Sequence, residues 1–188
     1  MVDSLIFIDA GFLSKLSKHL GSGEYIKFKI KDFIKNLEKK ENINFVEKFF
    51  YTAPPFQPTN PSPDEIKRKE NHDRFKDALE KEGIIVREGR CQKLGVAEEV
   101  QYKQKEVDVY LAMDLTNVLV KYPNVKKIIL ISSDSDFVPV IKNLKEQGVD
   151  TVLYTYYEKK RNIDFSRSNY LIKSVHKYVI IKKEDLEK

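Results

Sequence analysis

The sequence predicts a three-layer α/β fold with a mainly parallel central sheet. Short runs rich in β-branched residues alternate along the 188-residue chain with segments whose apolar residues recur at helical spacing. Two of these runs, 4–9 and 127–131, are apolar almost throughout, as strands of a parallel sheet buried on both faces are. Acidic residues end both runs: Asp9 closes the first, and Asp134 and Asp136 follow the second. Because open α/β sheets bind ligands beyond the carboxyl ends of their strands, these acids mark the expected site.

The composition is that of a folded, soluble protein that suits a reducing compartment. Charged residues make up 34% of the chain, its net charge is +5 and its sequence pI is about 9.0, which permits a nucleic-acid partner. No apolar run is long enough to span a membrane, and Met1 leads directly into a strand, so we expect neither a membrane anchor nor a signal peptide. The single cysteine, Cys91, excludes an intrachain disulfide and a thiolate zinc site, and favours the cytoplasm.

Turn residues separate the elements expected in the first half of the chain. Gly11 provides a tight turn after the first strand, and Gly21 and Gly23 stop the next helix. Residues 53–63 contain five prolines and predict an extended loop before a highly charged helix. The basic residues of that helix favour a solvated face, with nucleic-acid contact as the alternative. In order, we expect a strand at 4–9, helices at 12–20 and 30–40, a strand at 44–51 and a helix at 64–82.

The second half continues the alternation within the same domain. Residues 91–103 form a loop or hairpin with Gly95 at the bend, and Gly148 caps the helix that begins near Phe137. The other expected elements are strands at 84–89, 127–131, 150–154 and 178–181 and helices at 106–122 and 168–174. Without a linker or an internal repeat, residues 1–188 form one domain, of which 156–188 are a C-terminal extension.

Helix capping is the simplest explanation for the acids after the 127–131 strand. Ser133 with Asp136 has the spacing of a capping box, and acids in a first turn suit the helix dipole. Capping accounts for one acid better than for two, and it does not explain Asp9.

The helix expected at 106–122 carries two further acids beside its apolar stripe. Asp108 lies in the first turn, where stabilisation by the helix dipole and a functional role are equally good explanations. Asp114 lies in the middle of the helix, and a salt bridge with Lys121 is its favoured explanation, so it is only a secondary site candidate.

Asp9, Asp108, Asp134 and Asp136 are expected to converge at the carboxyl edge of the sheet. Four adjacent carboxylates repel one another, and a divalent cation relieves that repulsion. Oxygen ligands without a Cys or His cluster favour Mg²⁺ or Mn²⁺ over Zn²⁺. The chemistry that such a site serves best is attack of water on a phosphodiester.

Three stretches of the chain resemble the motifs of the NYN domain, of the PIN-like nuclease superfamily, and most closely its LabA-like branch. They are 7–13, 105–109 and 131–137, and the resemblance spans roughly residues 2–155. It implies a PIN-like fold and a metal-dependent ribonuclease. By position it makes Asp9, Asp108, Asp134 and Asp136 the metal-binding and catalytic acids, and Lys105, Ser132 and Ser133 the substrate-binding residues.

Two positions depart from the pattern of that family. Ser133 stands where many members have glycine, which alters the acidic turn without removing a ligand. Phe12 stands where a polar residue, commonly asparagine, is frequent, so one polar contact near the metal is lost.

Other candidate sites have weaker support. His19, His72 and His176 lie in three separate segments without metal-ligand spacing, and the chain has no P-loop and no GxGxxG motif. Tyr154, Tyr156 and Tyr157 stand beside the basic residues Lys159, Lys160 and Arg161 and could stack bases, although alternation on an edge strand is the favoured explanation.

Three functions follow, in order of preference. The first is a metal-dependent endoribonuclease, and the second is an RNA-binding or regulatory module that has lost efficient catalysis. The third, a phosphatase of the haloacid-dehalogenase type, is disfavoured because Gly11 occupies the position of its second aspartate. We expect RNA as the partner and no membrane; DNA as a substrate and a homodimer both stay open.

Overall fold

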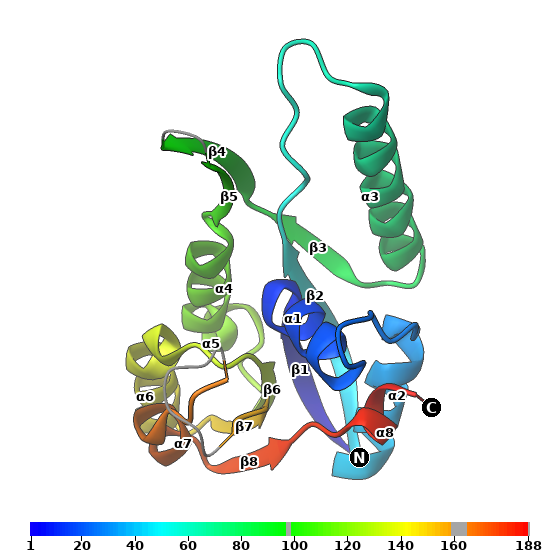
Figure 1. Ribbon diagram of the computed structural model, residues 1–188. Helices are drawn as coiled ribbons and strands as arrows, with labels where there is room; N and C mark the ends of the chain where they lie inside the picture. Colours follow the sequence, from blue (N-terminus) through cyan, green and yellow to red (C-terminus); the bar gives the residue numbers. More distant parts are fainter. Residues whose placement is uncertain (97–98, 159–164, 188) are drawn as a thin grey trace.

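A six-stranded, wholly parallel sheet forms the centre of the computed structural model, which describes residues 1–96, 99–158 and 165–187 (Figure 1). The strand order is β3-β2-β1-β6-β7-β8. These strands are β1 (Val2–Asp9), β2 (Ile43–Thr52), β3 (Ile85–Glu88), β6 (Lys127–Ile131), β7 (Asp150–Thr155) and β8 (Lys177–Ile180). A separate antiparallel hairpin pairs β4 (Arg90–Val96) with β5 (Glu99–Lys105). The α/β class and the parallel sheet expected from the sequence are confirmed.

Helices cover both faces of the sheet. They are α1 (Ala10–Leu20), α2 (Ile30–Glu41), α3 (Pro63–Lys81), α4 (Val107–Thr116), α5 (Val118–Lys121), α6 (Val138–Glu146), α7 (Asn169–Ser174) and α8 (Lys183–Leu186), with a 3₁₀ turn at Ser135–Phe137.

Alternate residues of the central strands build two separate cores. Ile6 and Ile8 of β1 pack with α1, α2 and α8 on one face. Leu5 and Phe7 pack with α4, α6 and α7 on the other. This alternation follows from the two-residue period of a strand and explains why β1 is apolar at nearly every position. The sheet is thereby buried on both sides, and only its edges are left for binding.

The order of the strands reverses between β1 and β6. From β1 the chain proceeds outward through β2 and β3, and from β6 it proceeds outward through β7 and β8 in the opposite direction. The two strands pair in register from Ser4 with Lys127 to Ile8 with Ile131, so that Asp9 and Ser132 leave the sheet side by side. Such a reversal opens a crevice beyond the carboxyl ends of the two strands, which is where α/β proteins place their ligands.

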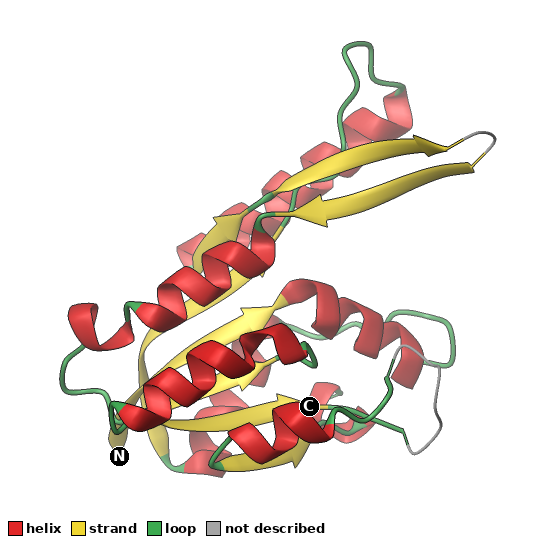
Figure 2. Cartoon of the chain, turned by 90° about the vertical axis from the view of Figure 1, so that its left-hand side faces the viewer, coloured by secondary structure: helices red, strands yellow, loops and turns green. Residues whose placement is uncertain are grey.

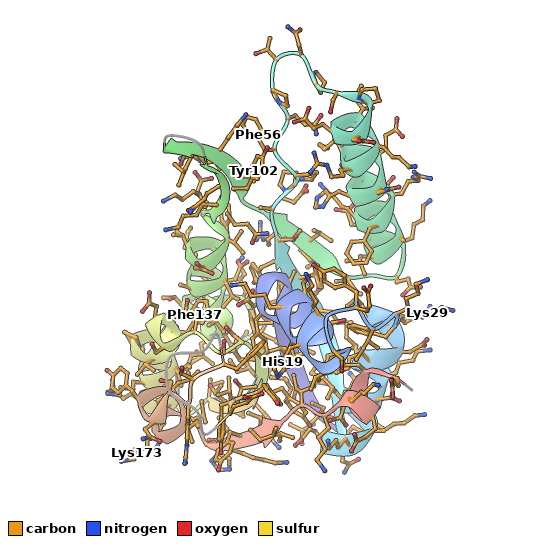
Figure 3. The ribbon with its side chains drawn as sticks, in the orientation of Figure 1. His19, Lys29, Phe56, Tyr102, Phe137 and Lys173 are labelled. Carbon is orange, nitrogen blue, oxygen red and sulfur yellow. The ribbon has the colours of Figure 1, made fainter. Side chains whose placement is uncertain are left out.

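Helix α3 and the β4–β5 hairpin, together called the arm, project past the carboxyl edge of the sheet (Figures 1 and 2). Ser62 begins α3 with a capping box that includes Glu65, directly after the proline-rich loop. That loop also contacts the hairpin, since the ring centroids of Phe56 and Tyr102 are 5.9 Å apart (Figure 3).

Local chemistry explains where the observed elements differ from the expected ones. The helix expected at 106–122 breaks at Asn117 into α4 and α5. Thr116 contributes to the break, because its hydroxyl donates to the carbonyl of Ala112 and competes with the helical pattern. Gly95 is not at the bend of the hairpin but inside β4, opposite Val100, and α8 was not expected at all. Among the described residues, no helix has the length and apolar character that crossing a membrane requires.

Replacing Gly89 with alanine should destabilise the protein, because two backbone segments meet there. A Cβ at Gly89 would lie 2.2 Å from the carbonyl oxygen of Lys105 and 2.9 Å from the backbone nitrogen of Val107. We expect Gly89→Ala to lower the free energy of unfolding by about 1–3 kcal/mol, as overpacking does. Urea denaturation measures this change in the free energy of unfolding. Gly95→Ala is the control, since a Cβ at Gly95 meets nothing within 4 Å. Equal unfolding midpoints for the two variants would contradict this packing.

Candidate active site at the carboxyl edge of the sheet

Asp9 is held at the end of β1 by two hydrogen bonds. Its Oδ1 accepts from the backbone N–H of Phe12 at 3.0 Å and thereby caps α1. Its Oδ2 accepts from the hydroxyl of Ser132 at 3.1 Å. Burial raises the pKa of the Asp9 carboxyl, the two hydrogen bonds lower it, and the neighbouring charge of Asp108 raises it again, with a net upward shift.

Ser132 connects the two strands at the point where the strand order reverses. Its side chain is 0% exposed, and its oxygen also accepts from the backbone N–H of Asp134 at 3.2 Å. The expectation that Ser132 contacts substrate stays a prediction; in this structure its hydroxyl is buried and already bonded to two partners. Its role is to position Asp9 relative to the acidic turn.

Asp134 and Asp136 form the turn that follows β6. Asp134 is the N-cap of the 3₁₀ turn, and its Oδ1 accepts from the backbone N–H of Asp136 at 2.9 Å. The capping box expected between Ser133 and Asp136 is therefore replaced by a cap on Asp134. Ser133 is half-buried in the same turn, and Asp136 is exposed.

Asp108 lies in the first turn of α4 and interacts electrostatically with the acidic turn. Partial burial raises the pKa of its carboxyl, and the charges of Asp134 and Asp136 raise it further. The helix begins after Glu106, whose φ of 73° is left-handed and whose side chain pairs with Arg90 at 2.5 Å. A strained residue directly before a helix is typical of functional sites, where the surrounding structure holds it in place.

The four acids are not neutralised by basic residues. Within the described ranges, none of Asp9, Asp108, Asp134 and Asp136 forms an ion pair with a lysine, arginine or histidine. The charge of Asp108 adds to the effect of burial on the pKa of Asp9, and the charges of Asp134 and Asp136 add to the effect of burial on the pKa of Asp108. The same described residues contain no three Asp, Glu, His or Cys side chains close enough together to hold a metal ion. The donor chemistry suits a hard cation, but the carboxylates do not form a compact group among the described residues.

Asp114, the secondary candidate, has a structural role. Its carboxylate is 9% exposed and accepts from the hydroxyl of Tyr51 at 3.0 Å and from Arg87 at 3.1 and 3.2 Å. Lys121 lies 3.5 Å away, so the salt bridge expected from the sequence is present. These partners compensate the charge of Asp114, and we leave it out of the site.

The other sequence candidates form no ion pair with the four acids among the described residues. Lys105 ends β5, opposite Arg90, and is half-buried close to Asp108 in sequence. The histidines each contact a separate carboxylate: His19 with Glu158, His72 with Glu88 and His176 with Asp150. Of the expected base-stacking group, Tyr154 is buried and donates to Glu41, and Lys159, Lys160 and Arg161 lie outside the described residues.

A cleft of about 960 Å³ adjoins the acids and was not foreseen from the sequence. Asp9 and Asp108 line it together with α1, the segment 25–30 and residues of the arm. Gly11 leaves room for the Asp9 carboxylate, since a Cβ there would lie 3.2 Å from Oδ1 of Asp9, and Oε1 of Gln104 from the arm would be in ordinary contact at 3.5 Å. The residues that sequence reasoning missed are Lys15, Tyr25, Lys27, Phe75, Tyr102, Lys103 and Gln104.

Replacing Asp9 with asparagine should not destabilise the metal-free protein. Because burial raises the pKa of Asp9 above its ordinary value of 3.8, the folded state binds more protons than the unfolded chain above that pH. The contribution of Asp9 to stability therefore falls as pH rises through the raised pKa. Asparagine removes this effect and still caps a helix. We expect Asp9→Asn to match or exceed the wild-type Tm at pH 7 in EDTA, with the difference shrinking toward pH 4.

Asp9→Ala is the comparison for this experiment, because it also removes the cap. It should cost about 1 kcal/mol of stability. An equal drop in Tm for Asp9→Asn and Asp9→Ala would mean that the ionised carboxylate itself stabilises the fold.

Comparison with known proteins agrees with this architecture. The family model of the NYN domain matches residues 4–180. A crystal structure of a protein of unknown function from Vibrio parahaemolyticus has a TM-score of 0.64 and 16% sequence identity, covering 98% of this chain and 95% of that chain. At that identity the likeness shows the fold alone. No curated protein matches this chain. With its acids at the carboxyl edge of a parallel sheet, this chain belongs to the NYN domain family, of the PIN-like nuclease superfamily.

Proposed function

We propose that this protein is a metal-dependent endoribonuclease. The observation that carries the proposal is the set of acids Asp9, Asp108, Asp134 and Asp136, which lie without basic partners among the described residues where the strand order reverses. The buried carboxylate of Asp114 is paired in this fold, so the lack of a basic partner for the half-buried Asp9 requires another explanation. A bound cation supplies that explanation.

The four acids would hold Mg²⁺ or Mn²⁺. Carboxylate oxygens are the ligands that these cations prefer, and the histidine nearest in the cleft lining, His72, is paired with Glu88. When bound, such an ion activates water and stabilises the leaving oxygen of a phosphodiester. At neutral pH the ion would also offset the burial, and the smaller effect of charge repulsion, that raise the pKa of Asp9 and Asp108.

The residues around the acids would position the reacting groups. Ser132 fixes the Asp9 carboxylate by its 3.1 Å hydrogen bond, so that one acid is oriented before an ion arrives. Lys105 and Ser133 are proposed to bind the phosphate, as lysine ammonium and serine hydroxyl groups do. Phe12 is buried, contributes to the core under α1 and also lines the cleft.

A second candidate is an RNA-binding module without efficient catalysis. It is favoured by the spread of the acids, because no three of them form a compact metal-binding group among the described residues. The cap that Asp134 provides to the turn also gives that residue a structural role.

Cleavage of RNA in the presence of Mn²⁺ or Mg²⁺ distinguishes the two candidates. We expect wild-type protein to cleave an unstructured RNA with either ion, EDTA to stop the reaction, and Asp134→Asn to abolish it, because a metal ligand is lost. Asp3→Asn serves as the control, since Asp3 lies near the opposite end of β1. Binding of RNA without metal-dependent cleavage would select the non-catalytic module.

A further inference from the structure

The cleft beside the acids combines basic and aromatic side chains that the proposed catalysis does not use. Asp9 and Asp108 form part of its lining, so a ligand in the cleft reaches the acids. Its volume of about 960 Å³ is at the upper end of the range for small-molecule sites and leaves space for an extended ligand. The arm contributes Tyr102, Lys103 and Phe75 to the lining. Helix α1 and the segment 25–30, together called the region of α1, contribute Lys15, Tyr25 and Lys27.

Three lysines without ion-pair partners among the described residues line the cleft beside its two acids. Lys15, Lys27 and Lys103 line it, and within the described part of the chain none of them forms an ion pair. They come from α1, from the segment before α2 and from β5, which is distant from the other two in the sequence. Lysines gathered in this way next to carboxylates suit a ligand with several negative charges, such as a phosphodiester backbone.

Aromatic rings in the same cleft are exposed to solvent. Tyr25 is 60% exposed, Tyr102 is 51% exposed and Phe75 is 44% exposed. Two of the rings contact a second ring: Phe56 packs against Tyr102 with ring centroids 5.9 Å apart (Figure 3), and Phe50 meets Phe75 edge-on at 5.8 Å. The ring of Tyr25 instead contacts Lys18, whose Nζ lies 5.8 Å from the ring centroid. Supported rings with one open face are stacking platforms for other planar groups.

Phosphates and planar groups occur together in a nucleic acid, and only unpaired bases expose their faces. In a duplex each base is stacked between its neighbours, and proteins that bind single strands use aromatic rings beside basic residues instead. Both features line one cleft here, and they lie on two structures, the arm and the region of α1, that face each other across it.

We propose that the arm is a clamp for an unpaired stretch of RNA. Tyr25 and Tyr102 stack its bases, while Lys15, Lys27 and Lys103 contact its phosphates. This inference rests on the proposed function for the reaction at Asp9 and Asp108, but it makes strand binding a property of the arm. The acids then act next to a clamped single strand, and paired RNA is excluded from the cleft.

Binding in EDTA tests the clamp without depending on cleavage. The probe is a fluorescein-labelled oligouridylate, and anisotropy gives its Kd. We expect Tyr102→Ala to raise the Kd by roughly 5- to 100-fold, the effect of losing one stacked base. An abasic strand of the same length should bind equally to wild type and Tyr102→Ala, because it has phosphates but no bases. Tyr170→Ala, which removes an exposed ring on α7 outside the cleft, should leave the Kd of the oligouridylate and that of the abasic strand unchanged.

Salt dependence tests the lysines. Replacing Lys15, Lys27 and Lys103 together with alanine should reduce the slope of log Kd against log salt by about 2, because each phosphate contact to a single strand contributes about 0.7 to that slope. Replacing Lys126, Lys145 and Lys173 removes the same charge outside the cleft and should leave the slope unchanged (Lys173 is labelled in Figure 3).

Any of three results would overturn the clamp. Tyr102→Ala could bind the oligouridylate with the same Kd as wild type, or the two triple lysine variants could have equal slopes of log Kd against log salt. The third is that the protein binds a duplex as tightly as the single strand. Melting curves of each variant would show that the fold is intact. If the expected binding is found but Mn²⁺ produces no cleavage, the proposed catalysis fails and the clamp stands. Cleavage without any effect of Tyr102→Ala on binding would instead overturn the clamp alone.

Discussion

The hydrogen bond from Ser132 to Asp9 is the constraint that organises the candidate site. It joins the ends of β1 and β6, the two strands between which the strand order reverses. Because Ser132 also accepts from the backbone N–H of Asp134, the same hydroxyl fixes the acidic turn. Through it, acids that are more than a hundred residues apart in sequence are presented at one edge of the sheet. Each acid is also held by a second contact: Asp9 is the N-cap of α1, and Asp134 is the N-cap of the 3₁₀ turn.

Most of the fold could be predicted from the sequence because burial on both faces leaves a clear pattern. The runs around Ile6 and Ile129 are apolar at successive positions, and only a strand between two layers of helices requires that. The break at Asn117 could not be predicted, since it involves one hydroxyl bond of Thr116 within an otherwise regular apolar stripe. The hairpin was located, but its direction and its register depend on contacts beyond the strand pair, such as the close approach at Gly89.

The candidate site was predictable in its acids and not in its surroundings. Asp9 and Asp134 follow apolar strands directly, so their place at the carboxyl edge follows from the parallel sheet. The direction of the Ser132 hydroxyl depends on the pairing of β1 with β6, which sequence spacing does not reveal. Tyr102 and Lys103 lie on a strand outside the main sheet, and only tertiary structure brings them to α1.

The central claim is that the four unpaired acids form one site that binds a hard cation. Anomalous diffraction from crystals soaked in Mn²⁺ tests it most directly, because the signal locates manganese without assumptions about the ligands. The account predicts a peak between Asp9, Asp108 and the turn at Asp134 and Asp136, with the carboxylates drawn together around it. A saturating soak that places no ion there, with the carboxylates still apart, would contradict it.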